Sequence, residues 1–495
     1  MGPAQSRINF YTQQIRALNL IWALRKKGCF KIDDRVAVIG AGVAGCACAA
    51  GLRAFGCIVD LYDDSHQPFA RQVAAQHREI YPDLNFWPET RDLNITTNIP
   101  IFDWSVDDCS NVVRRLREQW QTIQKKNEGY LNHIAERVNR ITISDRGSKI
   151  VSLKVGQTNR ASGGYKLAIL ACGFKPEINE FSKNQNYSAE YWEPDNYEYI
   201  RNKLNTEIKD IIISGGGDGG QIDTLRLIFD MRKGRLAFEV AKALDSTSIG
   251  SELHELWNKS SSSLLDESTY ERLAKKIANE PEYNEVRDLL HLEDFQKSNK
   301  RIHIASRSDT PYVKNAAPIH KLMLKYAELD GEVEVHKDSE VKFIKSRNVF
   351  KVGSQNYPKN QTLVIVRHGA GHAFEELLKK DELEILVGKQ QKSYKRKIMP
   401  IWGDDEKFPV PSGFWCKIDQ QASFIKEKFH EAHHALTRLG LSGFLLVPRD
   451  SSFTLYMHSL DDVPTHLFGI PLSVEQAVLN TGDQRSGLGE TFDAA

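Results

Sequence analysis

Arg35-Val-Ala-Val-Ile-Gly40-Ala-Gly42-Val-Ala-Gly45 is a short apolar run that leads directly into a glycine-rich turn. The apolar run predicts a buried strand over 35–39, and the small residues after it predict a helix over 43–55. A strand that turns this tightly into a helix is typical of the first unit of a dinucleotide-binding domain. The stretch therefore predicts an α/β fold built on parallel strands.

Each small residue of this turn has its own expected task. Gly40 permits the tight turn, Gly42 lets the backbone approach a phosphate, and Gly45 lets the helix pack closely on the strand. Val43 and Ala44 open the helix, so their amides belong to the end that faces the phosphate. We expect these five residues to bind the pyrophosphate of a dinucleotide.

An acidic residue ends the next predicted strand, which covers 57–62. Asp63 lies 18 residues after Gly45, a spacing that suits a carboxylate accepting a hydrogen bond from a ribose hydroxyl. Asp60 falls inside the alternating strand, and Asp64 lies just past its end. We therefore assign the ribose contact to Asp63.

A second turn of the same kind is Asp210-Ile-Ile-Ile-Ser-Gly215-Gly-Gly217-Asp-Gly-Gly220, whose first glycine lies 175 residues after Gly40. One such motif is weak evidence, whereas two predict that the chain holds two dinucleotides. That arrangement is typical of electron transfer between cofactors. The expected contacts in the second turn are its glycines and one acid: Gly215, Gly217, Asp218, Gly219 and Gly220.

The stretch between the two turns reads as a helix over 107–126 and short strands over 134–155. A further apolar strand over 165–170 runs straight into Ala171-Cys172-Gly173. A buried parallel strand that ends in small residues suits a place where the backbone approaches a cofactor. We expect Ala171, Cys172 and Gly173 to contact the first cofactor, with Cys172 as a packed small residue rather than a redox centre.

The order of these motifs resembles flavoproteins with two dinucleotide-binding domains, such as thioredoxin reductases and flavin-dependent N-hydroxylating monooxygenases. In those proteins an FAD fingerprint opens the first half, an Ala-Thr-Gly turn similar to Ala171-Cys172-Gly173 closes it, and a nicotinamide-binding domain follows. The resemblance implies two Rossmann-like domains of three-layer architecture. It implies an FAD-binding domain over 31–190 and an NAD(P)-binding domain over 205–370, and the amphipathic pattern near the start of the chain predicts a leading helix within 1–30.

Three departures from that pattern are visible. The strand after the second turn, 301–307, comes about 80 residues after Gly220, so we predict a helical insertion over about 232–298. The expected late Gly-Asp turn has only two candidates, Gly403-Asp404 and Gly482-Asp483, and neither follows a convincing strand. No CxxC pair exists, which argues against thioredoxin-reductase activity.

The choice of coenzyme has one clue. Arg307 ends the predicted second strand of the NAD(P) domain, where a carboxylate would accept from a free ribose hydroxyl. A guanidinium there favours a 2′-phosphate, and hence NADP over NAD, although a simple surface arginine is the alternative.

Composition points to small-molecule partners. The 66 basic and 65 acidic side chains nearly cancel, so no charge excess favours nucleic acid or an anionic membrane. The seven cysteines follow no disulfide spacing, which favours a reduced, cytoplasmic protein. We expect neither a nucleic-acid partner nor a membrane anchor, and we expect that the insertion or a second copy of the chain could supply a protein interface.

The region over 371–495 predicts a small α+β part, either a return of the FAD domain or a separate domain. Its predicted helix carries His430-Glu-Ala-His-His434, which matches the HExxH pattern of zinc hydrolases. Charged neighbours and the lack of a third ligand at a telling distance favour an exposed helix face, so no metal site is assigned.

The sequence thus predicts an FAD-dependent oxidoreductase that passes hydride from NAD(P)H through the flavin to an unidentified acceptor. The alternative is a nucleotide-binding sensor or regulatory protein that uses the same sites without turnover. No catalytic residue is assigned. Candidates near the expected cofactor loops are His77, Arg78, Arg367, His368 and, more remotely, His66.

Overall fold

The structure, a computed structural model, describes residues 8–91, 93–144, 150–177, 189–195, 208–229, 236–259, 266–290, 300–307, 316–372, 377, 384, 399–402, 408, 444–449 and 452–457. The chain divides into two compact units, Met1–Phe414 and Trp415–Ala495. Among the described residues, no helix is both long enough and apolar enough to cross a membrane.

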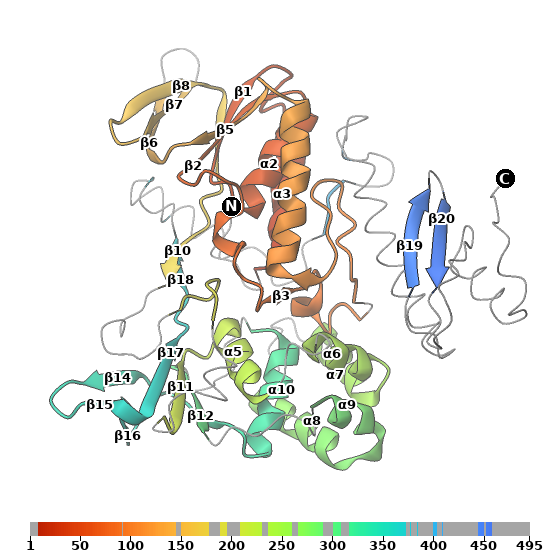
Figure 1. Cartoon of the computed structure of the whole chain (residues 1–495), viewed down its shortest axis with the longest axis vertical. Helices are drawn as coiled ribbons and strands as arrows, with labels where there is room; N and C mark the ends of the chain where they lie inside the picture. The colour runs from red at the N-terminus through yellow and green to blue at the C-terminus, as the bar shows by residue number, and fades with distance from the viewer. Residues whose placement is uncertain are drawn as a thin grey trace, which may run out of the picture. The chain divides into compact units, whose positions relative to one another are not determined.

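A parallel four-stranded sheet forms the centre of the first half of the larger unit. Its order is β5 (Leu131–Ala135), β2 (Ile58–Asp63), β1 (Arg35–Ile39) and β9 (Leu167–Leu170). Helix α2 (Val43–Ala54) packs on this sheet directly after the first glycine turn (Figure 1). The expected strand and helix around this turn are confirmed to within a residue or two at each end.

Two further helices and a meander complete this half. The leading helix α1 (Phe10–Lys26) packs against α2 with buried Leu18 and Ile21, as its apolar spacing requires. The expected helix over 107–126 is α3 (Cys109–Lys126), capped by the Asp108 carboxylate. The antiparallel strands follow it: β6 (Val138–Ser144), β7 (Ile150–Val155) and β8 (Arg160–Tyr165).

A second parallel four-stranded sheet lies in the other half of the same unit. Its order is β13 (Glu334–His336), β12 (Arg301–Ala305), β11 (Asp210–Ser214) and β17 (Thr362–Val366). Helices α5 (Asp218–Ile228) and α10 (Pro318–Leu329) pack together beside it (Figure 1). The meander β14 (Val341–Ile344), β15 (Val349–Val352) and β16 (Gln355–Pro358) contributes to a separate apolar cluster with Ile212 and Val364.

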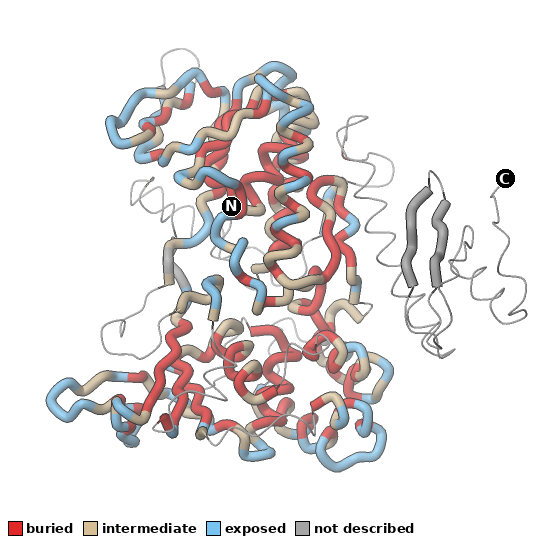
Figure 2. Tube along the Cα trace, viewed as in Figure 1, coloured by how far each residue is buried: buried red, intermediate tan, exposed pale blue. Residues whose placement is uncertain are grey.

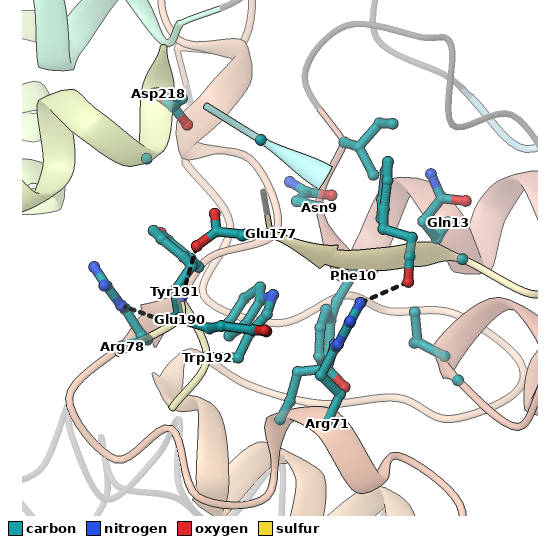
Figure 3. A pocket seen from close by; sticks show the side chains of 18 of the residues that line it. Asn9, Phe10, Gln13, Arg71, Arg78, Glu177, Glu190, Tyr191, Trp192 and Asp218 are labelled. Carbon is teal, nitrogen blue, oxygen red and sulfur yellow. Dashed lines mark hydrogen bonds between the residues drawn. The ribbon is translucent and has the colours of Figure 1, made fainter. Parts of the chain in front are cut away.

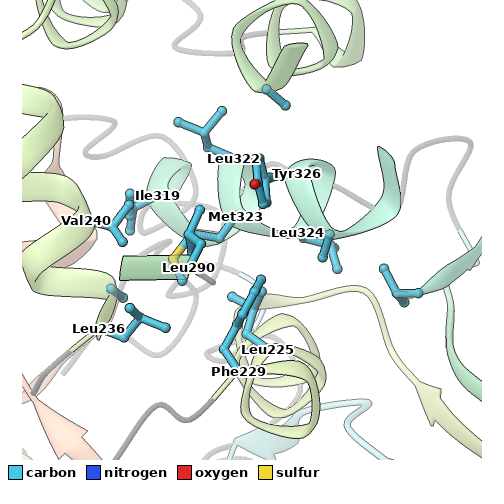
Figure 4. Close-up of a cluster of buried hydrophobic side chains, with 14 of the residues drawn as sticks. Leu225, Phe229, Leu236, Val240, Leu290, Ile319, Leu322, Met323, Leu324 and Tyr326 are labelled. Atoms are coloured by element: carbon cyan, nitrogen blue, oxygen red, sulfur yellow. The ribbon is translucent and has the colours of Figure 1, made fainter. Parts of the chain in front are cut away.

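The predicted helical insertion is confirmed. It contains α6 (Leu236–Asp245), α7 (Ser248–Lys259), α8 (Glu267–Asn279), η3 (Pro281–Tyr283) and α9 (Asn284–Leu290). Its apolar faces join one continuous core with α5 and α10, where Leu236 and Val240 lie near Leu225 and Ile319 (Figure 4). Because this core is shared, the insertion is built into the second half rather than appended to its surface.

Short elements connect the two halves. Strands β10 (Phe174–Glu177) and β18 (Ala370–His372) pair antiparallel, one leaving the first half and the other following the second sheet. The aromatic, proline-containing segment after β2 is mostly irregular. It contains η1 (Ala70–Gln72), β3 (Glu79–Ile80) and η2 (Leu84–Phe86), and β3 pairs with β4 (Asp107–Asp108). In the second half, the short turn η4 (Lys359–Gln361) precedes β17.

The smaller unit contains one described hairpin, β19 (Phe444–Arg449) with β20 (Ser452–Met457). Both Gly-Asp candidates and the predicted helix with His430 lie outside the described residues. Figure 2 shows the buried strands and the exposed meander tips of the larger unit. The predicted mixed α/β class with parallel sheets is confirmed.

Candidate functional site

The first glycine turn is shaped by contacts that leave no room for side chains. Gly40 has φ of +104°, and a Cβ there would lie 2.3 Å from the carbonyl oxygen of Ala171. A Cβ on Gly45 would lie 1.7 Å from the carbonyl oxygen of Gly40. These contacts hold the turn, the start of α2 and the end of β9 together, so both glycines are required by packing.

Gly42 has a different environment. It is the N-cap of α2, and a Cβ added there would meet no atom within 4 Å. The first turn of the helix, which begins with Val43 and Ala44, contains no acidic residue. Open space beside unpaired helical amides is what a phosphate group needs, so the turn fits a pyrophosphate.

Asp63 lies at the carboxyl end of β2, beside this turn. Its Oδ2 accepts a hydrogen bond from the Ala41 amide at 2.7 Å, and its Oδ1 accepts from the Ser65 amide at 2.9 Å. The carboxylate therefore fixes the position of the glycine turn. Its contact with a ribose hydroxyl stays a prediction.

The small residues after β9 line the opposite side of the turn. Gly173 has φ of +67°, and the Cys172 thiol donates to the Ile39 carbonyl at 3.6 Å. Burial raises the pKa of Cys172 to about 11. Since a thiol with so high a pKa stays protonated at neutral pH, this geometry favours the packing interpretation of Cys172.

The second glycine turn repeats the geometry of the first. Gly215 has φ of +135°, and a Cβ there would lie 2.2 Å from the carbonyl oxygen of Arg367. A Cβ on Gly220 would lie 1.8 Å from the Gly215 carbonyl oxygen, whereas one on Gly217 would meet nothing within 4 Å. Gly217 is the N-cap of α5, so this turn also fits a phosphate.

Asp218 places an acid in the first turn of α5, where a carboxylate would repel a phosphate. The structure holds that carboxylate against α10, with 2.7 Å to His320 Nδ1 and a hydrogen bond of 3.0 Å from the Ala317 amide. Burial alone would raise the pKa of Asp218, but His320 and the amide outweigh it and lower the pKa overall. Asp218 therefore joins α5 to α10, and its contact with a cofactor stays a prediction. Gly219 lies against the Tyr191 ring.

One cavity of about 2060 Å³ is lined by both turns. Ligand pockets for single small molecules usually measure about 300–1,000 Å³, so the space is large enough for more than one. All the residues predicted as cofactor contacts line it except Gly45 and Gly220, which serve the packing behind the two turns. The cavity therefore brings the two predicted sites together.

Between the two turns lies a buried ionic network that holds the two halves together. Asp223 of α5 is fully buried and accepts hydrogen bonds from Arg78 and, at 2.6 Å, from Nε of Arg367. Arg226 extends the network to Asp195 at 2.6 Å. Arg78 and Arg367 were candidates from the sequence, and the structure gives both a shared partner that joins elements distant in the chain.

Tyr191 is a cavity residue that the sequence analysis missed. The Arg78 guanidinium lies 3.8 Å from the centre of its ring and donates to its carbonyl at 3.0 Å. The Glu177 carboxylate accepts from the Tyr191 amide at 3.0 Å, as Figure 3 shows. No spacing in the sequence marks Tyr191, because its neighbours come from three distant segments.

Two titratable side chains line the same region. Burial, together with the nearby Arg78 charge, lowers the pKa of His77 to about 4, so the imidazole is neutral at neutral pH. Burial raises the pKa of Glu177, although Arg367 partly offsets this effect. One oxygen of Glu177 accepts from Tyr191 and Arg367, which leaves its other oxygen for a molecule in the cavity.

The remaining predicted residues lie at the edges. Arg307 lines the cavity at the end of β12 and forms an ion pair of 2.6 Å with Glu340, which also lines it. His368 lines the cavity and lies 2.7 Å from the Ser214 hydroxyl. His66 is exposed and does not line the cavity.

The fold and the paired turns define a class of oxidoreductases that use two dinucleotides. Residues 34–221 match the model of the pyridine nucleotide-disulphide oxidoreductase family. No curated protein matches the chain. The family match confirms the resemblance drawn from the sequence and the expected enzyme class, an FAD- and NAD(P)-dependent oxidoreductase.

Several solved structures are similar to this chain at low identity. The bacillithiol disulfide reductase from Bacillus cereus is 13% identical over 70% of this chain and 81% of its own, with a TM-score of 0.36. The same enzyme from Staphylococcus aureus is 10% identical over 70% and 79%, with a TM-score of 0.39. Thioredoxin reductase from Lactococcus lactis is 13% identical over 68% and 78%, with a TM-score of 0.34.

Proposed function

We propose that the first turn binds FAD, that the second binds NADPH, and that hydride passes from the nicotinamide through the flavin to a small-molecule acceptor. The observation that supports this proposal is the single cavity lined by both turns. Gly42 and Gly217 would each receive a pyrophosphate at a helix N-terminus. A shared cavity is what two cofactors need if their rings are to meet.

When bound, the two cofactors supply the redox chemistry, and the protein supplies position and exclusion of water. The Arg78–Asp223–Arg367 network would hold the two halves in register around the rings. Tyr191, stacked on Arg78, would close the cavity wall between the turns. Glu177, whose pKa is raised by burial, is the residue we propose to hold a proton near the acceptor.

The proposed preference for NADPH rests on Arg307. Its guanidinium lies at the end of β12, where the ribose of a nucleotide at the second turn belongs. Glu340 neutralises part of its charge, so the preference we expect over NADH is moderate. The described cysteines are free thiols, which supports the proposal of a reducing, cytoplasmic compartment.

The decisive experiment is the visible absorbance spectrum of the purified protein before and after anaerobic addition of NADPH. We expect a flavin spectrum that bleaches on addition. A protein that stays colourless, even after incubation with FAD, contradicts the proposal. A flavin that stays oxidised with both NADPH and NADH contradicts the hydride step and favours the nucleotide sensor.

A matched pair of variants assigns the two turns. Asp is a good N-cap residue, so Gly42→Asp and Gly217→Asp keep the helix starts but put a carboxylate at the proposed phosphate position. Because like charges repel strongly in such a site, Gly42→Asp should weaken FAD binding by at least about 100-fold. Gly217→Asp should retain FAD and lose NADPH binding by a similar factor.

The controls for this pair are Gly42→Asn and Gly217→Asn, which add nearly the same volume without charge. Equilibrium dialysis with FAD, and flavin reduction titrated with NADPH, give the two readouts. If both aspartate variants lost the same cofactor, the assignment of one dinucleotide to each turn would be wrong.

A further inference from the structure

The second sheet carries a cluster of metal-ligand side chains away from the two glycine turns. His303 of β12 lies in register with Glu334 of β13, and Ala305 with His336. Because side chains alternate along a strand, Glu334 and His336 lie on one face of β13, and the register puts His303 on that same face. Two imidazoles and a carboxylate therefore meet at the edge of the sheet.

The distances within the cluster are short. Nδ1 of His303 lies 3.2 Å from Nε2 of His336 and 3.3 Å from the Glu334 carboxylate, which is 3.6 Å from Nε2 of His336. Each residue offers one ligand atom, and these three atoms lie within 4.8 Å of one another. The three donor groups thus lie close enough together to share one ion.

The 3.2 and 3.3 Å separations from Nδ1 of His303 to Nε2 of His336 and Oε2 of Glu334 are close to the edges of a tetrahedral metal site, while the 3.6 Å contact involves the other oxygen, Oε1. Zinc binds nitrogen and carboxylate oxygen at about 2.0–2.2 Å, which places neighbouring ligands of a tetrahedron about 3.3–3.6 Å apart. The nitrogen and oxygen ligands are types that Zn²⁺ accepts. The cluster thus has the spacing and the chemistry of three zinc ligands with one open position.

A second layer of hydrogen bonds orients these ligands. The Nε2 of His303 lies 3.0 Å from the fully buried Asp210 carboxylate, and Arg301 also donates to that carboxylate. A neutral His303 that donates to Asp210 through Nε2 presents a lone pair at Nδ1, the atom that faces the cluster. This carboxylate–histidine arrangement is the one that metal-bound imidazoles usually have.

The remaining ligands are similarly supported. Gln355 donates to one oxygen of Glu334 at 3.0 Å, which leaves the other oxygen facing His303. The Tyr357 hydroxyl lies 3.3 Å from Nε2 of His336, the same nitrogen that faces His303 and Glu334.

We propose that His303, Glu334 and His336 bind a zinc ion. His303 is almost fully buried, whereas Glu334 is about half exposed, so the ion can enter from solvent and keep a water at the open position. The His336 carbonyl accepts from the Ser306 amide at 3.0 Å, next to Arg307 at the cavity edge. The ion would fasten β13 to β12 and hold the segment that carries Arg307.

The test is zinc binding by the full-length protein, freed of metal with a chelator and titrated against a chromophoric competitor. We expect tight zinc binding by the unaltered protein. Loss of an outer hydrogen-bond partner typically weakens metal binding about 10–100-fold, so Asp210→Asn should fall in that range. Glu334→Gln and His336→Asn remove ligands and should weaken binding by at least about 100-fold.

Two controls distinguish this cluster from other places on the chain where zinc could bind. Asp338→Asn makes the same change from carboxylate to amide at a nearby exposed turn and should bind zinc like the unaltered protein. His430→Ala with His434→Ala removes the HExxH pattern and should also leave the binding unchanged. Circular dichroism establishes that each variant is folded, and Glu334→Gln, at an exposed position, keeps the test valid if a buried histidine variant fails to fold.

X-ray absorption of the zinc-loaded protein gives an independent readout, with two imidazole nitrogens and oxygen at about 2.0–2.2 Å expected. The proposal is overturned if the unaltered protein binds no zinc, if Glu334→Gln and His336→Asn bind it as tightly, or if only the His430 and His434 changes abolish binding. In those cases the cluster is a hydrogen-bonded histidine pair.

Discussion

The two glycine turns of this protein have the same backbone geometry and different surroundings. In each, the first glycine has a positive φ and lies against the carbonyl of a neighbouring strand end, that of Ala171 in one and Arg367 in the other. In each, the N-cap glycine, Gly42 or Gly217, faces open space. In both turns, therefore, an equivalent contact between the turn and the adjacent strand end requires glycine at the first position.

The difference between the halves lies at the end of the second strand. Asp63 ends β2 and bonds back to the glycine turn through Ala41. Arg307 follows β12 and pairs with Glu340 at the cavity edge. Packing thus shapes the two turns in the same way, and we propose that the residue after the second strand sets which nucleotide fits best.

The largest effect we expect comes from filling the packed glycines. Gly45→Ala and Gly220→Ala would each place a methyl group within 2 Å of a backbone carbonyl oxygen, at 1.7 and 1.8 Å. Neither helix can stay on its strand with that overlap, so we expect each variant to lose its folded half. Soluble yield and thermal unfolding measure this, with Gly42→Ala and Gly217→Ala as controls that should fold normally.

If either Gly45→Ala or Gly220→Ala folded normally, the two turns would differ in how tightly they are packed, and they would not be structurally equivalent. A failure of Gly42→Ala or Gly217→Ala to fold would show that the open space beside the N-caps has a structural task of its own.

A smaller loss of stability is expected from a change in the ionic network between the two halves. Asp223→Asn leaves the buried Arg78 and Arg367 guanidinium groups without their shared counter-charge, and breaking such a pair costs about 3–5 kcal/mol. Denaturant unfolding measures this loss. Glu118→Gln, which breaks an exposed ion pair with Arg114, is the control and should cost about 1 kcal/mol or less.

The same network predicts a dependence on pH. Burial alone would raise the pKa of Asp223, but Arg78 and Arg367 outweigh it and hold the pKa well below the usual 3.8. A carboxylate with a depressed folded pKa stabilises the fold above about pH 4 and loses this contribution as the pH falls below it. Asp223→Asn should therefore show a weaker loss of stability in acid, and equal acid sensitivity would contradict this role.

The smallest effect concerns the choice of coenzyme. Arg307→Ala should lower the ratio of kcat/KM for NADPH over NADH by about tenfold, because it removes a charged partner of the 2′-phosphate. Glu340→Gln should raise that ratio, because it removes a carboxylate that neutralises part of the guanidinium charge. Steady-state flavin reduction with both coenzymes measures it, and a ratio that neither change moves would make Arg307 a surface residue.

Several elements could be predicted because their signals are local. The run Val36–Ile39 is apolar and short, and the glycines after it leave few other conformations, so β1 and α2 follow from a dozen residues. The delay before β12 likewise predicted the helical insertion. The ends of these elements differ slightly from the predicted ends, because caps and hydrogen bonds fix where an element begins and ends. For example, the strand predicted over 165–170 is interrupted at Lys166.

Other features had no local signal. Asp223 lies inside an ordinary helix, and its partners Arg78 and Arg367 lie 145 and 144 residues away. His303, Glu334 and His336 come from two strands separated by α10, and their spacing matches no metal motif. Asp218 was expected to contact a cofactor, and only the structure shows that its carboxylate also lies 2.7 Å from His320 of α10.

The sequence by itself determined that this protein has two glycine-rich turns after apolar strands, parallel strands around them and an inserted group of helices, because glycine conformation and apolar periodicity act over a few residues. Only the tertiary structure decided that both turns open into one cavity, which arginines share Asp223, and that two histidines meet a glutamate. Those relations depend on strand register and on crossovers between distant segments. Neither is encoded in any short stretch of the chain.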